Sequence, residues 1–162
     1  VGEARVDGLE LSVNQSLSPL DHHLGGWGKS LRVFANLTRL NLKGSRTADF
    51  AGFLPTSINY GIQINRKLFG ASIKANYRSD ENSGTVAALG ANGRNYFRGR
   101  THIDVNFNYN IRPNLGVFVN LRNITDRYNK SYKAGEGLPA YAKLVSIRNY
   151  GIPFNFGIKG SF

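Results

Sequence analysis

The stretch "HIDVNFNYNI", His102–Ile111, places an apolar residue at every second position. Its five apolar residues alternate with one histidine, one aspartate and three asparagines. Strict alternation over this length is typical of a β-strand that has one apolar face and one polar face. The stretch therefore predicts a strand.

The same alternation recurs along the chain, and helical periodicity is hard to find. It occupies six further stretches, Leu9–Leu17, Leu31–Leu37, Ile58–Ile64, Phe69–Tyr77, Leu115–Leu121 and Ile152–Phe162. Phe34 breaks the pattern because it falls on the polar side of its stretch. With 162 residues, the length of one ordinary domain, the chain is predicted to be all-β with about seven antiparallel strands.

The predicted connections alternate in length. Asn65–Leu68 and Ile111–Leu115 are tight turns, and the second has the Pro-Asn chemistry of a chain reversal. The long connections are Gly44–Thr56, Ser79–Gly99 and Arg127–Ser146. Short turns on one side and long loops on the other are typical of an outer-membrane barrel. Ser18–Ser30 departs from this rule, since it is a longer loop on the short-turn side.

The composition narrows the class of protein further. The chain has no cysteine, which excludes disulfides and cysteine-based zinc sites, and a net charge of +11. A basic balance favours nucleic acid, an anionic surface or the lining of a channel. The chain begins at Val1 and has neither methionine nor an apolar leader, so we expect it to be a segment of a longer protein.

The aromatic residues favour lipid as the solvent of the apolar face. Tyr60, Tyr77 and Phe154 fall near the long-loop ends of their strands, and Phe69, Tyr109 and Phe162 near the short-turn ends. Phe69 and Tyr77 are eight residues apart. At a tilt of about 40° this is about 20 Å along the membrane normal, close to the spacing of the two aromatic girdles of a barrel.

An odd number of antiparallel strands also means that the segment cannot close on itself. Because open edges are costly in hydrocarbon, further strands are expected before Val1.

The stretch "FVNLRNITDRYN", Phe118–Asn129, resembles the R-N-[LI]-[TF]-[DN]-x-x-Y pattern on the next-to-last strand of TonB-dependent outer-membrane receptors. Tyr128 departs from that spacing by one place. Other stretches resemble the same receptors in the same order: "VDGLELSVNQSL", "LKGSRTADFAGFLPTSINYGI", "YRSDENSG", "RTHIDVNFNYNIRPNLGVF" and "FGIKGSF". The resemblance spans nearly the whole chain, and it is to the C-terminal part of the barrel.

The resemblance implies a 22-stranded transmembrane barrel of which residues 1–162 form roughly the last third. It implies import of a scarce ligand, such as an iron-siderophore, a cobalamin or a glycan, with energy from the TonB complex. The plug domain and the segment that engages TonB are expected outside this chain. Lipopolysaccharide and outer-membrane lipid are the expected surroundings.

The resemblance to these receptors implies roles for two sets of residues. The closing strand resembles the signal that the barrel assembly machinery reads, through Phe154, Phe156, Ile158 and Phe162. Four polar-side residues are expected to face the lumen and to contact the plug or the passing solute: Lys74, Arg78, Asp104 and Arg122.

The sequence offers little support for a nucleotide site, a metal site or an enzyme. "GGWGKS", Gly25–Ser30, lacks the first glycine of a phosphate-binding loop, because position 23 is His23, and no helix pattern follows. Asp21–His23 has no partner cluster with metal-ligand spacing, so a turn is favoured over a metal site. No catalytic constellation occurs, and we expect neither enzyme activity nor a cofactor.

Two alternatives remain open. Basic residues interleaved with aromatics in Asn92–His102 could bind nucleic acid as part of a soluble β-protein. The chain could also belong to a passive, porin-like barrel.

Overall fold

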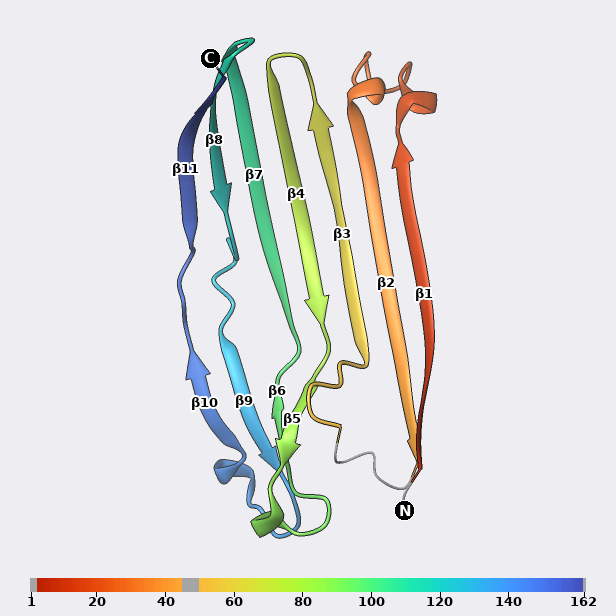
Figure 1. The fold of residues 1–162 in the computed structure, drawn as a ribbon, viewed down its shortest axis with the longest axis vertical. Coiled ribbons are helices and arrows are strands. Elements are labelled where there is room, and N and C mark those ends of the chain that lie inside the picture. The colour runs from red at the N-terminus through yellow and green to blue at the C-terminus, as the bar shows by residue number, and fades with distance from the viewer. Residues whose placement is uncertain (1–2, 45–49, 162) are drawn as a thin grey trace.

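The computed structural model describes residues 3–44 and 50–161, and these form eleven strands and short 3-10 turns (Figure 1). Seven strands make one antiparallel sheet in the order β1-β2-β3-β4-β7-β8-β11. Their bounds are β1 Ala4–Ser16, β2 Leu31–Gly44, β3 Thr56–Asn65, β4 Phe69–Arg78, β7 Arg100–Arg112, β8 Leu115–Leu121 and β11 Phe154–Gly160. The prediction of an all-β antiparallel fold is confirmed, and each of the seven alternating stretches contributes a strand.

The predicted number of about seven strands was too low. A second, four-stranded sheet has the order β10-β9-β6-β5. Its strands are β5 Glu81–Thr85, β6 Arg94–Phe97, β9 Asn129–Ala134 and β10 Leu144–Arg148. Two of the long connections, Ser79–Gly99 and Arg127–Ser146, therefore contain paired strands rather than irregular loops.

The second sheet prolongs part of the first. Along the chain β5 follows β4, β6 precedes β7, β9 follows β8 and β10 precedes β11. The order β5-β6-β9-β10 thus repeats the order β4-β7-β8-β11 beyond a break in each strand. In Figure 1 the second sheet lies at the bottom, opposite the tight turns at the top.

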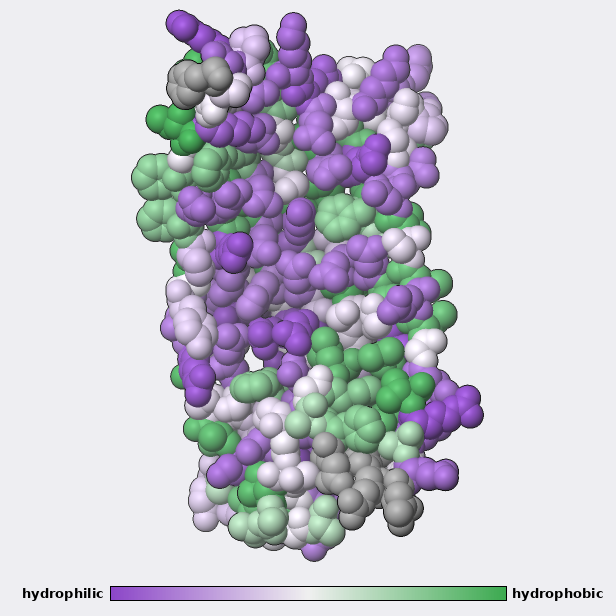
Figure 2. Space-filling model, in the orientation of Figure 1, coloured by the Kyte–Doolittle hydropathy of each residue, from purple (hydrophilic) through white to green (hydrophobic). Residues whose placement is uncertain are grey.

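The register of the first sheet sorts its side chains onto two faces, because directly opposed residues share a face. One row runs across six strands and is wholly apolar: Val33, Ile62, Ile73, Val105, Leu121 and Phe154. The neighbouring row is wholly polar: Arg32, Gln63, Ser72, Asn106, Asn120 and Asn155. We call these sides the apolar face and the polar face. The face turned to the viewer in Figure 2 is mainly hydrophilic over the middle of the molecule.

The sheet is open and encloses no core. Among the described apolar residues only Ala75 is buried, whereas the side chains of Ile73 and Phe156 are 52% and 71% exposed. The accessible surface is 11172 Å². A compact monomer of 17.9 kDa exposes only about 8,000 Å². Strands β1 and β11 form the two ends of the strand order, and the sheet does not close into a barrel.

The connections at the top of Figure 1 match the predicted tight turns. Arg66 donates its backbone N–H to the carbonyl of Phe69 at 2.8 Å, which closes the β3–β4 turn. The β1–β2 connection is longer and contains two 3-10 turns, η1 (Ser18–Leu20) and η2 (Gly28–Ser30). The remaining turns, η4 (Ala87–Leu89) and η5 (Ala140–Ala142), lie in the loops of the second sheet. In the part of the chain that the structure describes, no helix has the length and apolarity needed to cross a membrane.

Candidate functional site

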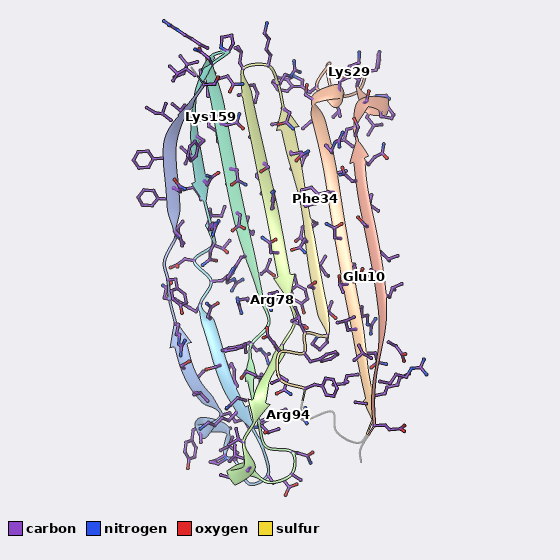
Figure 3. The ribbon with its side chains drawn as sticks, in the orientation of Figure 1. Glu10, Lys29, Phe34, Arg78, Arg94 and Lys159 are labelled. Carbon is purple, nitrogen blue, oxygen red and sulfur yellow. The ribbon has the colours of Figure 1, made fainter. Side chains whose placement is uncertain are left out.

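The four residues predicted to share a polar surface lie on one side of the first sheet. Lys74 and Arg78 are on β4 and Asp104 is on β7, all in register with the polar face. Arg122 follows β8 and, with three asparagines of the polar row, lines a hollow of about 420 Å³. Figure 3 shows Arg78 near the lower end of the first sheet.

Amides and hydroxyls make up much of the rest of the polar face, and they bond across strands. The Asn106 side-chain amide donates to the Ser72 hydroxyl at 3.1 Å, and the Ser12 hydroxyl donates to the side-chain oxygen of Asn36 at 2.7 Å. Asn76 donates to the Asp104 carboxylate at 3.0 Å. Lys74 is the register partner of Asp104, but no ion pair joins the two. The polar face is therefore covered by hydrogen-bonded side chains and carries more cations than anions.

Two phenylalanines stand on this polar face. Phe34 opposes Gly61, and Phe118 opposes Gly157. A Cβ added to Gly61 would lie 2.9 Å from the Phe34 ring, and one added to Gly157 would lie 2.8 Å from the Phe118 ring. Each ring thus covers the backbone of a glycine on the next strand, an arrangement that shields a strand position without a side chain. This explains the break in alternation at Phe34.

Asn123, in the stretch that resembles the receptor motif, is the one buried polar residue among those described. Its backbone has φ 51, a left-handed conformation that asparagine tolerates. Its backbone N–H donates to the Asp104 carboxylate at 3.0 Å, and its side-chain oxygen accepts from the Arg127 N–H at 3.0 Å. Its side-chain amide donates to the Arg127 carbonyl at 3.2 Å and is 3.5 Å from that of Gly151. Asn123 therefore ties the β8–β9 break to β7 and to the β10–β11 break.

The four breaks between the sheets form a polar seam, at residues 79–80, 98–99, 122–128 and 149–153. Asp80 spans two of them, since it accepts from the Gly99 N–H at 2.6 Å and from the Arg98 guanidinium at 3.3 Å. Arg78 pairs with Glu81 at 2.7 Å across the same break. Sequence reasoning read "YRSDENSG" as a strand followed by a loop and gave Asp80 no role, because nothing local marks its long-range partners.

Two of the hollows beside the seam differ in the residues that line them. The first, of about 250 Å³, has four cations and one acid among its lining residues: Arg78, Arg100, Lys130, Arg148 and Glu81. The second, of about 480 Å³, which we call the mouth hollow, has a mostly apolar lining with one cation and one acid: Leu40, Leu42, Phe53, Pro55, Tyr96, Arg94 and Asp80. Arg94, labelled near the bottom of Figure 3, forms no ion pair with a described residue. No sequence motif marks the mouth hollow, because its lining comes from segments that are distant along the chain.

The described residues of the predicted assembly signal lie on the apolar face. Phe154, Phe156 and Ile158 are 68%, 71% and 74% exposed, and the first two rings stack at 6.2 Å between centroids. Phe162 lies outside the described residues. Strand β11 is thus an edge strand with an open apolar surface.

No metal-binding cluster of three or more histidine, cysteine or acidic residues occurs within residues 3–44 and 50–161. The carboxylate of Asp21, a candidate metal ligand in the sequence, accepts a hydrogen bond from the backbone N–H of Lys29 at 3.2 Å.

No family model, curated protein or solved structure matches the chain.

Proposed function

We propose that this chain is a wall segment of a TonB-dependent receptor in the bacterial outer membrane, where the receptor imports a scarce ligand. One observation carries the proposal: the first sheet has one mainly apolar face, with a row that is wholly apolar from β2 to β11, and the described residues offer nothing to cover it. A water-soluble protein would hide this face in a core. In a membrane barrel the acyl chains cover it, and the polar face borders an aqueous interior.

The open edges of the sheet support the same proposal. Each unpaired N–H or C=O of β1 and β11 costs several kcal/mol in hydrocarbon, so both edges need further strands. The receptor barrel would supply these strands, and the barrel assembly machinery would bring β11 to its partner. On this proposal Phe154, Phe156 and Ile158 face lipid.

The second sheet and its hollows would lie on the extracellular side. There the mouth hollow, with its mostly apolar lining and with Arg94, which forms no ion pair with a described residue, would help to form the ligand entrance. Lys74, Arg78, Asp104 and Arg122 would border the lumen and contact the plug or the solute. Exposed cations at the outer end, such as Arg5 and Lys43, would meet lipopolysaccharide.

The first experiment separates a membrane wall from a soluble basic protein that binds nucleic acid. The chain is refolded in buffer alone and in detergent micelles, and its sheet content and sedimentation are measured. The membrane proposal predicts ordered sheet only in detergent. A monomeric, folded chain in buffer that binds DNA with a steep salt dependence would favour the alternative.

The second experiment tests import in the full receptor. The double variant Arg78→Gln/Arg122→Gln should lower ligand uptake more than barrel folding, because both cations are removed from the polar face. The control Arg5→Gln/Arg39→Gln removes two cations near the outer end of β1 and β2, on the opposite face. Unchanged uptake in the first variant would contradict the role of the two arginines. Uptake that survives collapse of the proton gradient would favour a passive, porin-like barrel.

A further inference from the structure

A compact aromatic cluster lies at the tight-turn end of the sheet, away from the second sheet and its hollows. The guanidinium of Arg66 lies over the ring of Trp27, 4.1 Å from its centroid. The Trp27 ring is 6.5 Å from that of Phe69, which stacks in turn on Phe107 at 6.5 Å. The cluster thus joins the β1–β2 connection to the β3–β4 turn and to β7.

The cluster borders the apolar face. Phe69 and Phe107 belong to that face, since Phe69 opposes Tyr109 and Phe107 opposes Ala71. The ring of Trp27 extends this surface beyond the ends of the strands and is 44% exposed. Two leucines of the neighbouring turns are also open to solvent, Leu20 at 48% and Leu68 at 56%. The amphipathic indole is therefore where the apolar band meets the polar turns.

The β1–β2 connection holds Trp27 in a defined place. Arg66 donates to the Gly26 carbonyl at 3.0 Å, and Leu31 donates its N–H to the Trp27 carbonyl at 3.2 Å. Gly28 packs so closely on Asp21 that an added Cβ would lie 2.7 Å from the Asp21 Cα. The arrangement is thus preorganised before any partner arrives.

The turns at this end carry an excess of positive charge. Their cations are Lys29, Arg66, Lys67 and Arg112, and their only acid is Asp21. Asp21 lies 3.7 Å from the Lys29 ammonium, while the other three cations form no ion pair with a described residue. An apolar band, an indole at its border and an excess of cations beyond it match the three layers of a membrane leaflet with anionic headgroups.

We propose that this end of the sheet binds the headgroup of an anionic phospholipid. Arg66 holds the phosphate with its planar guanidinium, and Trp27 fixes the depth of the strand ends at the interface. Lys67 and Arg112 add attraction for negative charge. The inference rests on the proposed function, because it requires the apolar face to lie against acyl chains, but it assigns a lipid preference that the barrel wall alone does not need.

The test uses Trp27 itself, which is the only tryptophan of the chain. The full chain is refolded with vesicles of phosphatidylcholine, with and without phosphatidylglycerol. Affinity and depth are read from the tryptophan emission and from its quenching by lipids brominated near the headgroup. We expect tighter binding and a blue-shifted, quenched emission on the vesicles with phosphatidylglycerol.

Variants separate the site from general charge. Arg66→Gln should lose about five-fold in affinity for the anionic vesicles and nothing on the neutral ones, whereas Arg66→Lys should retain part of the preference. Lys43→Gln, which removes one cation at the opposite end of β2, should leave the preference unchanged. Circular dichroism confirms that each variant folds.

The possible failures are distinguishable. Equal binding to both kinds of vesicle, or an anionic preference that Arg66→Gln leaves intact, overturns the proposed headgroup site. Either result leaves the proposed membrane-barrel function standing. Binding to neither vesicle overturns both proposals.

Discussion

Phe34 on β2 stands directly opposite Gly61 on β3, and its ring lies 2.9 Å from the position that a Cβ on Gly61 would occupy. Phe118 and Gly157 repeat this pair between β8 and β11. The two glycines differ in what else surrounds them. A Cβ at Gly61 would also meet the backbone carbonyl of Ile73, whereas the three atoms nearest to a Cβ at Gly157 all belong to the Phe118 ring.

This difference predicts that the same glycine-to-alanine substitution lowers the free energy of unfolding by different amounts at the two positions. Gly61→Ala should lower the free energy of unfolding by about 2 kcal/mol, because the backbone of β4 must move. Gly157→Ala should cost less than about 1 kcal/mol, since only a ring must turn. Denaturant titration in micelles, followed by circular dichroism, measures both. Equal costs would contradict the packing described here.

A charge placed on each face tests which side meets lipid. Ile73→Lys puts an ammonium in the middle of the apolar face and should destabilise the membrane-inserted sheet by about 2–4 kcal/mol. Ser72→Lys, one position earlier, puts the same charge on the polar face and should have little effect. The stability of both variants is measured in phospholipid vesicles. A larger loss of stability in Ser72→Lys than in Ile73→Lys would indicate that lipid lies against the polar face, and it would refute the proposed orientation.

Loss of the Asn123 side chain should loosen the seam. Asn123→Ala removes three side-chain contacts and leaves a less suitable residue at φ 51, so we expect a loss of about 3 kcal/mol. Asn123→Gly relieves the backbone strain but not the lost hydrogen bonds, and should cost less. The nearby exposed Thr125→Ala is the control. If thermal unfolding of Asn123→Ala and Thr125→Ala occurs at the same temperature, the hydrogen bonds of Asn123 do not contribute to stability.

Asp80 should govern how firmly the second sheet is held. Asp80→Ala removes the acceptor of the Gly99 N–H, and hydrogen exchange at Gly99 and along β6 should accelerate. Glu136→Ala makes the same charge change at an exposed loop position and should leave these amides unaffected. Hydrogen exchange followed by mass spectrometry distinguishes the two variants. Unchanged protection in Asp80→Ala would show that backbone pairing alone holds the sheet.

The first sheet could be predicted from sequence because its information is local. In His102–Ile111 the alternation assigns each residue to one face, and the observed register of β7 with β4 and β8 keeps its paired apolar residues opposite apolar residues. The tight turn Ile111–Leu115 could be predicted for the same reason, since its proline and asparagine favour a chain reversal.

The second sheet was missed because its strands carry no such pattern. Strand β5 has the sequence Glu-Asn-Ser-Gly-Thr, which is typical of a loop. It pairs with β6 because the pairing of β4 with β7 brings these two segments side by side. Context thus outweighs weak β-propensity. The same applies to Asn123 and Asp80, whose partners lie on other strands and leave no mark in the neighbouring sequence.

The lack of a buried apolar centre among the described residues has a thermal consequence. The heat-capacity increment of a globular domain, about 12–15 cal/mol/K per residue, arises when unfolding hydrates apolar surface that the fold had hidden. A sheet that carries its isoleucines and phenylalanines on its outside hides little of that surface within itself. Its unfolding in micelles should therefore show a small heat-capacity increment, and cooling should not weaken it as it weakens a globular protein.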